Sequence, residues 1–312
     1  MERKKMKVYL APMEGITGYV YRNAFHKCFT DADKYFIPFI VPHTKRDFNE
    51  KERKELLPAH NEGMHTVPQI LTKSAEDFLS LSEVLKDMGY REVNLNAGCP
   101  SGTVVSKNRG AGLLKDPEFL NRFLDGIFSK TDLKVSVKTR IGMEDREEFY
   151  DLLSVYNRYP LHELIIHPRV RKDFYKNRPD FDMFAYALEY SRNPVVYNGD
   201  LWDKEAVLRF EERFPEAKTV MIGRGVLRNP GLIGELKGEE KADPDRLKAF
   251  HDELLHSCEE ELGGGSAVLF RMKELWSYMG ESFPGSDKAL KKIRKAKNLS
   301  EYRSAVQEIF KN

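Results

Sequence analysis

The stretch KVSVKTR, residues 134–140, joins a short β-branched run to basic residues at its carboxyl end. Seven other segments likewise read as apolar or β-branched runs bounded by turn residues, which is typical of strands buried on both faces. The eight predicted strands are Val8–Met13, Tyr35–Pro42, Thr66–Leu71, Glu92–Asn96, Lys134–Thr139, Glu163–His167, Pro194–Asn198 and Thr219–Gly223.

Helix-like segments separate most of these strands. Ser74 and Asp77 form a capping-box pattern, Pro117 stands at a first helical position, and Asp203 is a candidate N-cap. The gap 44–60 is polar and charged, and it fits either a weak helix or a loop over a site. The predicted helices are Gly18–Cys28, Ser74–Asp87, Asp116–Ser129, Glu144–Arg158, Phe181–Ser191 and Asp203–Arg213.

Strands that alternate with helices over about 225 residues predict a (β/α)8 TIM barrel. A doubly wound sheet is the alternative, but the regular repeats favour closure. The dinucleotide fingerprint is also missing, because Gly223-x-Gly225 continues to Arg228 where a third glycine would be required.

The composition changes after Leu236. Residues 237–246 (KGEEKADPDR) read as a linker, so the barrel is predicted to occupy residues 1–236. Residues 247–312 show helical spacing without strand signals, which predicts a small C-terminal all-α domain. Its predicted helices are Leu247–Leu262, Ala267–Gly280, Asp287–Lys297 and Ser300–Lys311.

The overall composition of the 312 residues excludes several classes of protein. No apolar run approaches the roughly 20 residues that span a bilayer, and the N-terminus lacks a signal-peptide core. Cys28, Cys99 and Cys258 are far apart, and no CxxC or HExxH spacing occurs, which argues against a disulfide framework and against a metal site. We therefore expect a reduced, cytoplasmic protein without a metal or a membrane contact.

Polar or special residues follow every predicted strand. Loops are polar in general, so one such strand end would carry little weight, but a full set at the face where barrel enzymes hold their chemistry indicates a site. The set comprises Met13-Glu14, His43, Gln69, Asn96 with Cys99, Lys138 with Arg140, His167 with Arg169, Asn198 with Asp200, and Gly223-Arg224.

Two glycine-containing loops follow the last two strands. Asn198-Gly199-Asp200 and Gly223-Arg224-Gly225 match the position of the recurrent phosphate site of such barrels, with a short helix predicted at Val226–Leu232. Glycine lets backbone N–H groups approach phosphate oxygens, and Arg224 adds a bidentate donor. The alternative is that both are simply tight turns.

Three further residues carry candidate chemistry. The alternation of residues along the predicted strand directs the Lys138 side chain toward the barrel axis. An unpaired ammonium is costly to bury there, so it suits an electron-rich ring edge or an anionic reduced flavin as its partner. His167 is either a satisfied core group or a site residue. Cys99, on a loop before a proline, reads as a proton donor at least as readily as a nucleophile. Cys28 and Cys258 fall on apolar helix faces and are predicted to be core.

The chain resembles the tRNA-dihydrouridine synthases along nearly its whole length. Any one of the matching segments would be weak evidence, but several in the same order are specific. They are LAPMEGITGYVYR (10–22), VPQIL (67–71), NLNAGCPS (94–101), RGAGLL (109–114), VKTRIG (137–142), IHPRVRKDFYK (166–176), NGD (198–200) and MIGRG (221–225). The chain departs from the family's His-Gly-Arg-Thr pattern at His167-Pro168-Arg169-Val170, which stiffens that loop and removes a hydroxyl.

The resemblance implies FMN at the rim and NADPH or NADH as reductant. The flavin would pass a hydride to C6 of uracil, while Cys99 would give a proton to C5. The resemblance further implies that Pro12 and Met13 lie against the isoalloxazine, that Gln69 and Lys138 bond to its ring edge, that His167 sits near the ring and phosphate side, and that the phosphate is held by Asn198, Gly199, Asp200, Gly223 and Arg224.

The implied substrate is tRNA or another structured RNA, whose target base must leave its stack to reach a flavin. Asn96 is a candidate substrate contact, and a basic margin beside the site is predicted from Arg140, Arg169, Arg171, Lys172, Lys176 and Arg178. In the C-terminal region, one helical face carries four lysines, Lys288, Lys291, Lys292 and Lys295. This face is interpreted either as an RNA-binding surface or as the solvated face of an amphipathic helix. A monomer is the working expectation, although the sequence carries no signal on assembly.

Two other functions compete with this hypothesis. One is an FMN barrel that acts on a free small molecule, such as a dihydroorotate or enoate oxidoreductase, without dependence on RNA. The other is an RNA-binding protein whose barrel has lost catalysis, which would be colourless.

Overall fold

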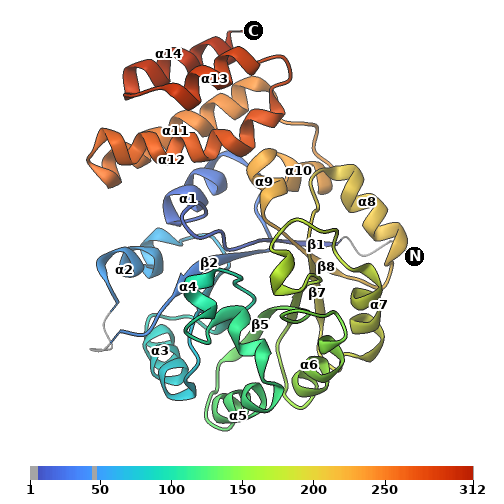
Figure 1. Cartoon of the computed structure of the whole chain (residues 1–312). Helices are drawn as coiled ribbons and strands as arrows, with labels where there is room; N and C mark the ends of the chain where they lie inside the picture. The colour runs from blue at the N-terminus through green and yellow to red at the C-terminus, as the bar shows by residue number, and fades with distance from the viewer. Residues whose placement is uncertain (1–5, 44–47, 312) are drawn as a thin grey trace.

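Eight parallel strands close into a barrel in which each strand pairs with its neighbours in chain order. The computed structural model describes residues 6–43 and 48–311. Lys7 pairs with Thr219 and Leu10 with Ile222, so the last strand closes on the first (Figure 1). This confirms the predicted TIM barrel. The strands are β1 (Lys7–Leu10), β2 (Lys34–Ile40), β3 (Thr66–Ile70), β4 (Glu92–Ala97), β5 (Lys134–Arg140), β6 (Leu164–His167), β7 (Val195–Asn198) and β8 (Thr219–Ile222).

Helices surround the barrel, and several begin at the predicted caps. Asp116 Oδ1 accepts from the N–H of Phe119 at 3.0 Å, and Asp203 Oδ1 accepts from that of Ala206 at 2.8 Å. The barrel helices are α1 (Tyr19–Cys28), α2 (Glu50–Leu56), α3 (Ala75–Asp87), α4 (Gly102–Val105), α5 (Pro117–Phe128), α6 (Glu148–Tyr156), α7 (Phe181–Tyr190), α8 (Lys204–Arg213), α9 (Arg224–Arg228) and α10 (Leu232–Leu236).

The capping boxes differ from the prediction. Ser74 accepts from the N–H of Asp77 at 3.1 Å, but the Asp77 carboxylate accepts from the Thr72 hydroxyl at 3.3 Å, so the box is half formed. A reciprocal box exists instead between Asn49 and Glu52, at the start of α2. The polar gap therefore contains a helix; its residues 44–47 lie outside the described residues.

The C-terminal domain packs on α1 through an apolar interface. Its helices are α11 (Pro244–Leu262), α12 (Gly265–Met279), α13 (Asp287–Lys295) and α14 (Leu299–Phe310). The ring of Phe250 meets Tyr21 edge-on at 5.6 Å and Phe29 at 5.3 Å. Figure 1 shows α11 and α12 lying across α1, while α13 and α14 form an outer layer. Because Asp243 caps α11 and Pro244 is its first residue, the helix begins three residues before the predicted Leu247.

The interior of the barrel is filled below the mouth. Alternate residues of six strands form a buried cluster of their own: Tyr9, Phe36, Val67, Ile165, Val196 and Met221, with Ala11. At the amino ends of the strands, the ammonium of Lys34 bonds to Glu92 at 2.8 Å and to Glu163 at 2.9 Å. Side chains of the described residues thus fill the amino-side end of the barrel, so a ligand site is expected at the carboxyl-side mouth.

Two other predictions concern the burial of the cysteines and contact with a membrane. Cys258 is buried as predicted, whereas Cys28, at the end of α1, is only half-buried. Within residues 6–43 and 48–311, no helix has the length and apolar character needed to cross a membrane.

Candidate active site

A cavity of about 80 Å³ opens at the carboxyl-side mouth, where residues at and after the carboxyl ends of β1, β5, β6, β7 and β8 meet. All of the predicted cofactor residues except Gln69 line it: Pro12, Met13, Lys138, His167, Asn198, Gly199, Asp200, Gly223 and Arg224. The structure thus gathers residues that lie up to about two hundred positions apart in the chain, as expected for the rim of a closed barrel.

The two glycine loops approach each other closely. The Asn198 amide donates to the Met221 carbonyl at 2.8 Å, which ties the end of β7 to β8. A Cβ added at Gly225 would lie 2.1 Å from the carbonyl oxygen of Leu201, so only glycine fits there. This close contact lets α9 begin at Arg224, directly after β8. The short helix was predicted at Val226–Leu232. In the structure, α9 begins two residues earlier and already ends at Arg228.

Asp200 is clamped between two arginines. The buried guanidinium of Arg169 donates to both Asp200 oxygens, and Arg224 Nη2 donates to Oδ1 at 2.8 Å. Arg224 also stacks on the Trp202 ring at 4.3 Å. A carboxylate repels a phosphate, so this geometry favours the Asp200 side chain as the group that positions Arg224, while the place of Asp200 in the phosphate site stays a prediction.

His167 is held as a neutral imidazole. Its Nε2 lies 2.9 Å from Arg169 Nη1, and because a guanidinium only donates, this nitrogen accepts and Nδ1 carries the proton. Burial and the surrounding cations, Arg140 first among them, lower its pKa well below the ordinary value. His167 therefore offers the cavity a hydrogen-bond donor without a charge.

Lys138 is the opposite case, a cation without a partner. Throughout the described part of the chain, no side chain or carbonyl accepts a hydrogen bond from its ammonium. Burial, with the Arg140 guanidinium as the second cause, lowers the pKa of Lys138 from 10.5 to about 8. Such a group suits a negatively charged or electron-rich ligand in the cavity.

We expect Lys138→Met to stabilise the protein, because it removes a cation that has no hydrogen-bond partner. Because the folded-state pKa is lowered, the cost of holding the ammonium is fully present below about pH 8 and disappears as the pH rises toward 10.5. The variant should melt about 2–4 °C higher at pH 7, with a gain that shrinks above pH 8. Thermal melts between pH 7 and 10 check this, and a gain that grows with pH would contradict it.

Gln69 and Asn96 form a hydrogen-bonded chain that ends at Cys99. Asn96 Nδ2 donates to Gln69 Oε1 at 2.7 Å, and Gln69 Nε2 donates to Asn94 Oδ1 at 2.8 Å. The side-chain oxygen Oδ1 of Asn96 accepts from the backbone N–H groups of Gly98 at 3.1 Å and Cys99 at 2.9 Å. Gln69 is buried and does not line the cavity; in this structure it braces the cysteine loop, and its contact with a flavin edge stays a prediction.

Cys99 itself is half-buried beside the mouth. Its thiol lies close enough to Lys138 and Arg140 to interact electrostatically with both. On its other side, a Cβ at Gly110, whose φ is +57°, would lie 2.9 Å from the Cys99 carbonyl oxygen. The loop is thus fixed from two directions.

The predicted basic margin is wrong for Arg140 and Arg169, both of which are buried. Arg140 donates to the carbonyls of Gly98 at 3.0 Å, Val170 at 3.0 Å and Phe174 at 2.7 Å, and so joins the cysteine loop to the loop after β6. Arg171 is half-buried and donates to the Pro100 carbonyl at 3.2 Å. The exposed remainder of the predicted margin is Lys172, Lys176 and Arg178.

Two aromatic residues were not predicted. The Tyr175 ring lies 5.4 Å from Arg140 and 4.8 Å from Arg224, so it spans the mouth from the β5 side to the β8 side. It is 49% exposed, and its neighbour Phe174 has a strained φ of +51°. Trp202 supports Arg224. For Tyr175, the signal available in the sequence was that aromatic residues stand among basic ones in the segment RVRKDFYK.

The lysine face of α13 lies along a groove shared with α14. Lys288, Lys291, Lys292 and Lys295 are exposed and line it, while Ala289, Ile293 and Ala296 are buried on the other face as predicted. Acidic residues of α14 also border the groove, and Lys292 pairs with Glu308 at 2.7 Å. Acidic residues of α14 therefore partly neutralise the positive charge of this lysine face, which the sequence pattern of α13 alone did not reveal.

One metal-like cluster is present within the described ranges, at the amino end of the barrel. Ligand atoms of Glu92, His162 and Glu163 lie within 4.8 Å of one another. Lys34 already bonds to both glutamates, so the cluster reads as an ion-pair network that closes the barrel.

A closed parallel barrel with phosphate-type loops and cations at its carboxyl mouth defines this protein as a β/α-barrel enzyme. Solved structures agree on the fold. The structure of morphinone reductase in complex with tetrahydroNAD superposes with a TM-score of 0.54 at 13% identity, over 78% of this chain and 90% of that chain. A variant of NCR from Zymomonas mobilis gives 0.53 at 12% identity, over 78% and 90%.

The chain belongs to the dihydrouridine synthase family, whose model, described as dihydrouridine synthase (Dus), matches residues 9–312. It is 26% identical to the tRNA-dihydrouridine(16) synthase of Shigella flexneri over 316 aligned positions, which cover 97% of this chain and 98% of the relative. It is 30% identical to the probable tRNA-dihydrouridine synthase of Staphylococcus epidermidis (strain ATCC 12228), over 71% of this chain and 69% of the relative.

Proposed function

We propose that this enzyme reduces uridine in tRNA to 5,6-dihydrouridine, with FMN at the barrel mouth and NADPH or NADH as the reductant. The observation that carries the proposal is the meeting, at one mouth, of a partnerless Lys138, a neutral His167, the loops at Gly199 and Gly223, and Cys99 beside them. The match to the family along almost the whole chain supports it.

The residues at the mouth fit an FMN in two parts. Asn198, Gly199, Gly223 and Arg224 would hold the phosphate, since their glycines leave space for oxygens and Arg224 supplies a cation. The enclosed volume, about 80 Å³, is smaller than a flavin, so its ring would extend across the mouth where the Tyr175 ring now lies. When bound, FMN would supply the hydride.

The residues around the flavin position divide the remaining chemistry among them. Lys138 would stabilise negative charge on the ring edge, and His167 would donate a hydrogen bond from Nδ1. Asn96 holds the backbone of Cys99, whose thiol would give its proton to C5 while C6 accepts the hydride. The two additions together leave no net charge on the reduced base, because one hydride and one proton are added across one double bond, and Cys99 is left as a thiolate that must regain its proton.

RNA binding would use basic residues outside the mouth. Lys172, Lys176 and Arg178 are exposed beside it, and the lysines of α13 lie on the C-terminal domain. Position 16 is the first tRNA uridine to test, because the relatives that match both domains at nearly full length carry this position in their names.

The test is to purify the protein, record its visible spectrum, and incubate it with NADPH and an unmodified tRNA transcript. We expect a yellow protein and dihydrouridine detected by mass spectrometry, with a transcript carrying cytidine at position 16 as the matched control. A colourless protein would support an RNA-binding function without catalysis. Oxidation of NADPH only in the presence of orotate or an enoate would support the small-molecule alternative.

A further inference from the structure

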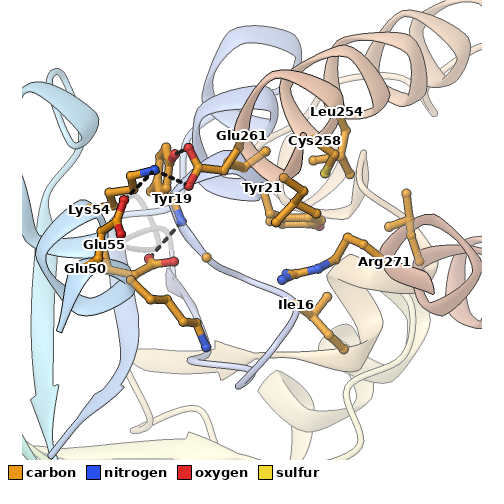
Figure 2. A pocket seen from close by; sticks show the side chains of 15 residues that line it. Ile16, Tyr19, Tyr21, Glu50, Lys54, Glu55, Leu254, Cys258, Glu261 and Arg271 are labelled. Carbon is orange, nitrogen blue, oxygen red and sulfur yellow. Dashed lines mark hydrogen bonds and ion pairs between the residues drawn. The ribbon is translucent and has the colours of Figure 1, made fainter. Parts of the chain in front are cut away.

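Two cavities away from the mouth differ in how their charges are paired. The first, of about 420 Å³, lies between α1 and α2 of the barrel and α11 and α12 of the C-terminal domain (Figure 2). Its acids are bound by neighbours: Glu261 by Lys54 at 2.8 Å, and Glu55 by the N–H of Tyr19 at 2.8 Å. The second, of about 380 Å³, lies at the amino end of the barrel, and we call it the amino-end cavity. Its cations have no such partners.

The amino-end cavity is built where strands begin. Arg91 precedes β4, Lys134 is the first residue of β5, and the N–H of Lys134 donates to the Arg91 carbonyl at 3.2 Å. His65 comes directly before β3, and His162 shortly before β6. Because the amino ends of all strands of a closed barrel meet at one face, these four side chains line a single space.

The two permanent cations of the cavity are adjacent and unpaired. Arg91 and Lys134 are exposed, and among the residues that the structure describes neither side chain has a hydrogen bond or an ion pair. Asp132, a carboxylate near Arg91, is already bound by Lys86. An anion between Arg91 and Lys134 would relieve their mutual repulsion and gain charge-assisted hydrogen bonds.

The acid in the cavity wall is neutralised. Lys34 donates to both carboxylate oxygens of Glu92, at 3.0 and 2.8 Å. Nε2 of His162 lies 3.6 Å from the same carboxylate, and the His65 side chain has no hydrogen bond within the described ranges. A neutral imidazole donates from one nitrogen and accepts at the other, so the two rings offer both kinds of bond to a ligand.

The end of α3 forms an apolar wall of the amino-end cavity. The N–H groups of Gly89 and Tyr90 donate to the carbonyls of Lys86 at 2.9 Å and Leu85 at 3.0 Å, with Gly89 at a φ of +99°. These bonds satisfy carbonyls that a helix end otherwise leaves free, which weakens the negative potential there. The hydroxyl of Tyr90 is directed away, to the Leu56 carbonyl at 2.9 Å, so its ring and Met88 present apolar surface.

We propose that the amino-end cavity binds a free nucleotide, with its phosphate between Arg91 and Lys134 and its base against the apolar wall. The volume lies in the range of small-molecule sites and exceeds what a bare phosphate would fill. A flat, partly polar ring beside a negative group matches an apolar wall with two imidazoles beside two cations. This inference goes beyond the proposed function and does not depend on it, because the cavity and the mouth lie at opposite ends of the barrel.

The first test is a calorimetric titration of the protein with AMP, with FMN added so that the mouth is occupied. The wild type should bind AMP, and Arg91→Ala and Lys134→Ala should each raise the dissociation constant about tenfold, as for loss of one charge-assisted contact. Lys130→Ala, which removes an exposed lysine outside the cavity, is the matched control and should bind as the wild type does. No binding by the wild type, or wild-type affinity in both cavity variants, would overturn the proposal.

The second test divides the ligand into its parts. Adenosine and inorganic phosphate should each bind at least tenfold more weakly than AMP. Adenosine that binds as tightly as AMP would overturn the phosphate contact, and phosphate that binds as tightly would reduce the cavity to a plain anion site. An unmodified tRNA transcript should not displace AMP, and competitive displacement would show that the occupant is RNA instead of a free nucleotide. Failure of the proposed function would appear as absence of dihydrouridine and would leave these titrations unchanged.

Discussion

Replacing Cys99 with alanine is expected to lower dihydrouridine formation by about 100- to 10,000-fold, the usual contribution of a general acid. The thiol lies beside Lys138 and Arg140 at the mouth, where it would protonate C5 of the base. Cys99 does not line the mouth cavity, so bound FMN and its reduction by NADPH should remain near the wild-type level. Single-turnover reaction of the reduced enzyme with tRNA isolates the affected step.

The matched control for this prediction is Cys28→Ala. Cys28 is a half-buried cysteine like Cys99, but it ends α1 away from the mouth. Its removal should leave the single-turnover rate unchanged. A Cys99→Ala enzyme that reacts at the wild-type rate would show that the proton comes from another group.

The barrel and the place of its site were accessible from the sequence for a physical reason. Parallel strands covered on both faces must be apolar, so each strand appears as a short run such as ELIIH at 163–167 that ends abruptly in polar residues. Closure brings all these ends to one rim. The residues Lys138, His167 and Arg224 were therefore predicted as neighbours without knowledge of any distance between them.

The errors concern burial and pairing, which depend on distant partners. Arg140 and Arg169 read as exposed because their neighbours in sequence are polar, yet carbonyls of other loops and the Asp200 carboxylate enclose them. Gln69 was predicted to contact a flavin, which stays a prediction, but the bonds of its amide to Asn94 and Asn96 were not foreseen. No local pattern reveals which donors in a barrel rim are already satisfied.

Tyr175 illustrates a different limit. Its ring lies over Arg140 and Arg224, which belong to opposite sides of the mouth and stand 84 positions apart in sequence. Only the path of the loop after β6, with Phe174 in the left-handed region, brings it there. A loop conformation of this kind is set by tertiary contacts such as the Arg140 bond to the Phe174 carbonyl.

We expect Asp200→Asn to destabilise the protein by up to about 3–5 kcal/mol, because Arg169 is buried and the loss of its partly exposed partner leaves that charge uncompensated. The Arg169 side chain is 1% exposed and directs its guanidinium at Asp200, which also holds Arg224. Asparagine tolerates the φ of +39° at this position, so backbone strain does not confound the result. Flavin retention should fall as well, since Arg224 loses its anchor.

The control is the same change on the surface. Asp182→Asn removes a carboxylate that is 76% exposed and pairs loosely with Arg213 at 3.6 Å and with Arg146 at 4.0 Å, so it should alter stability little. Urea unfolding of both variants, followed by circular dichroism, decides the matter. If Asp200→Asn unfolds at the same urea concentration as Asp182→Asn, then Arg169 does not depend on this carboxylate, and the bonds of its guanidinium to the Asn177 carbonyl and to His167 suffice to hold it in the rim.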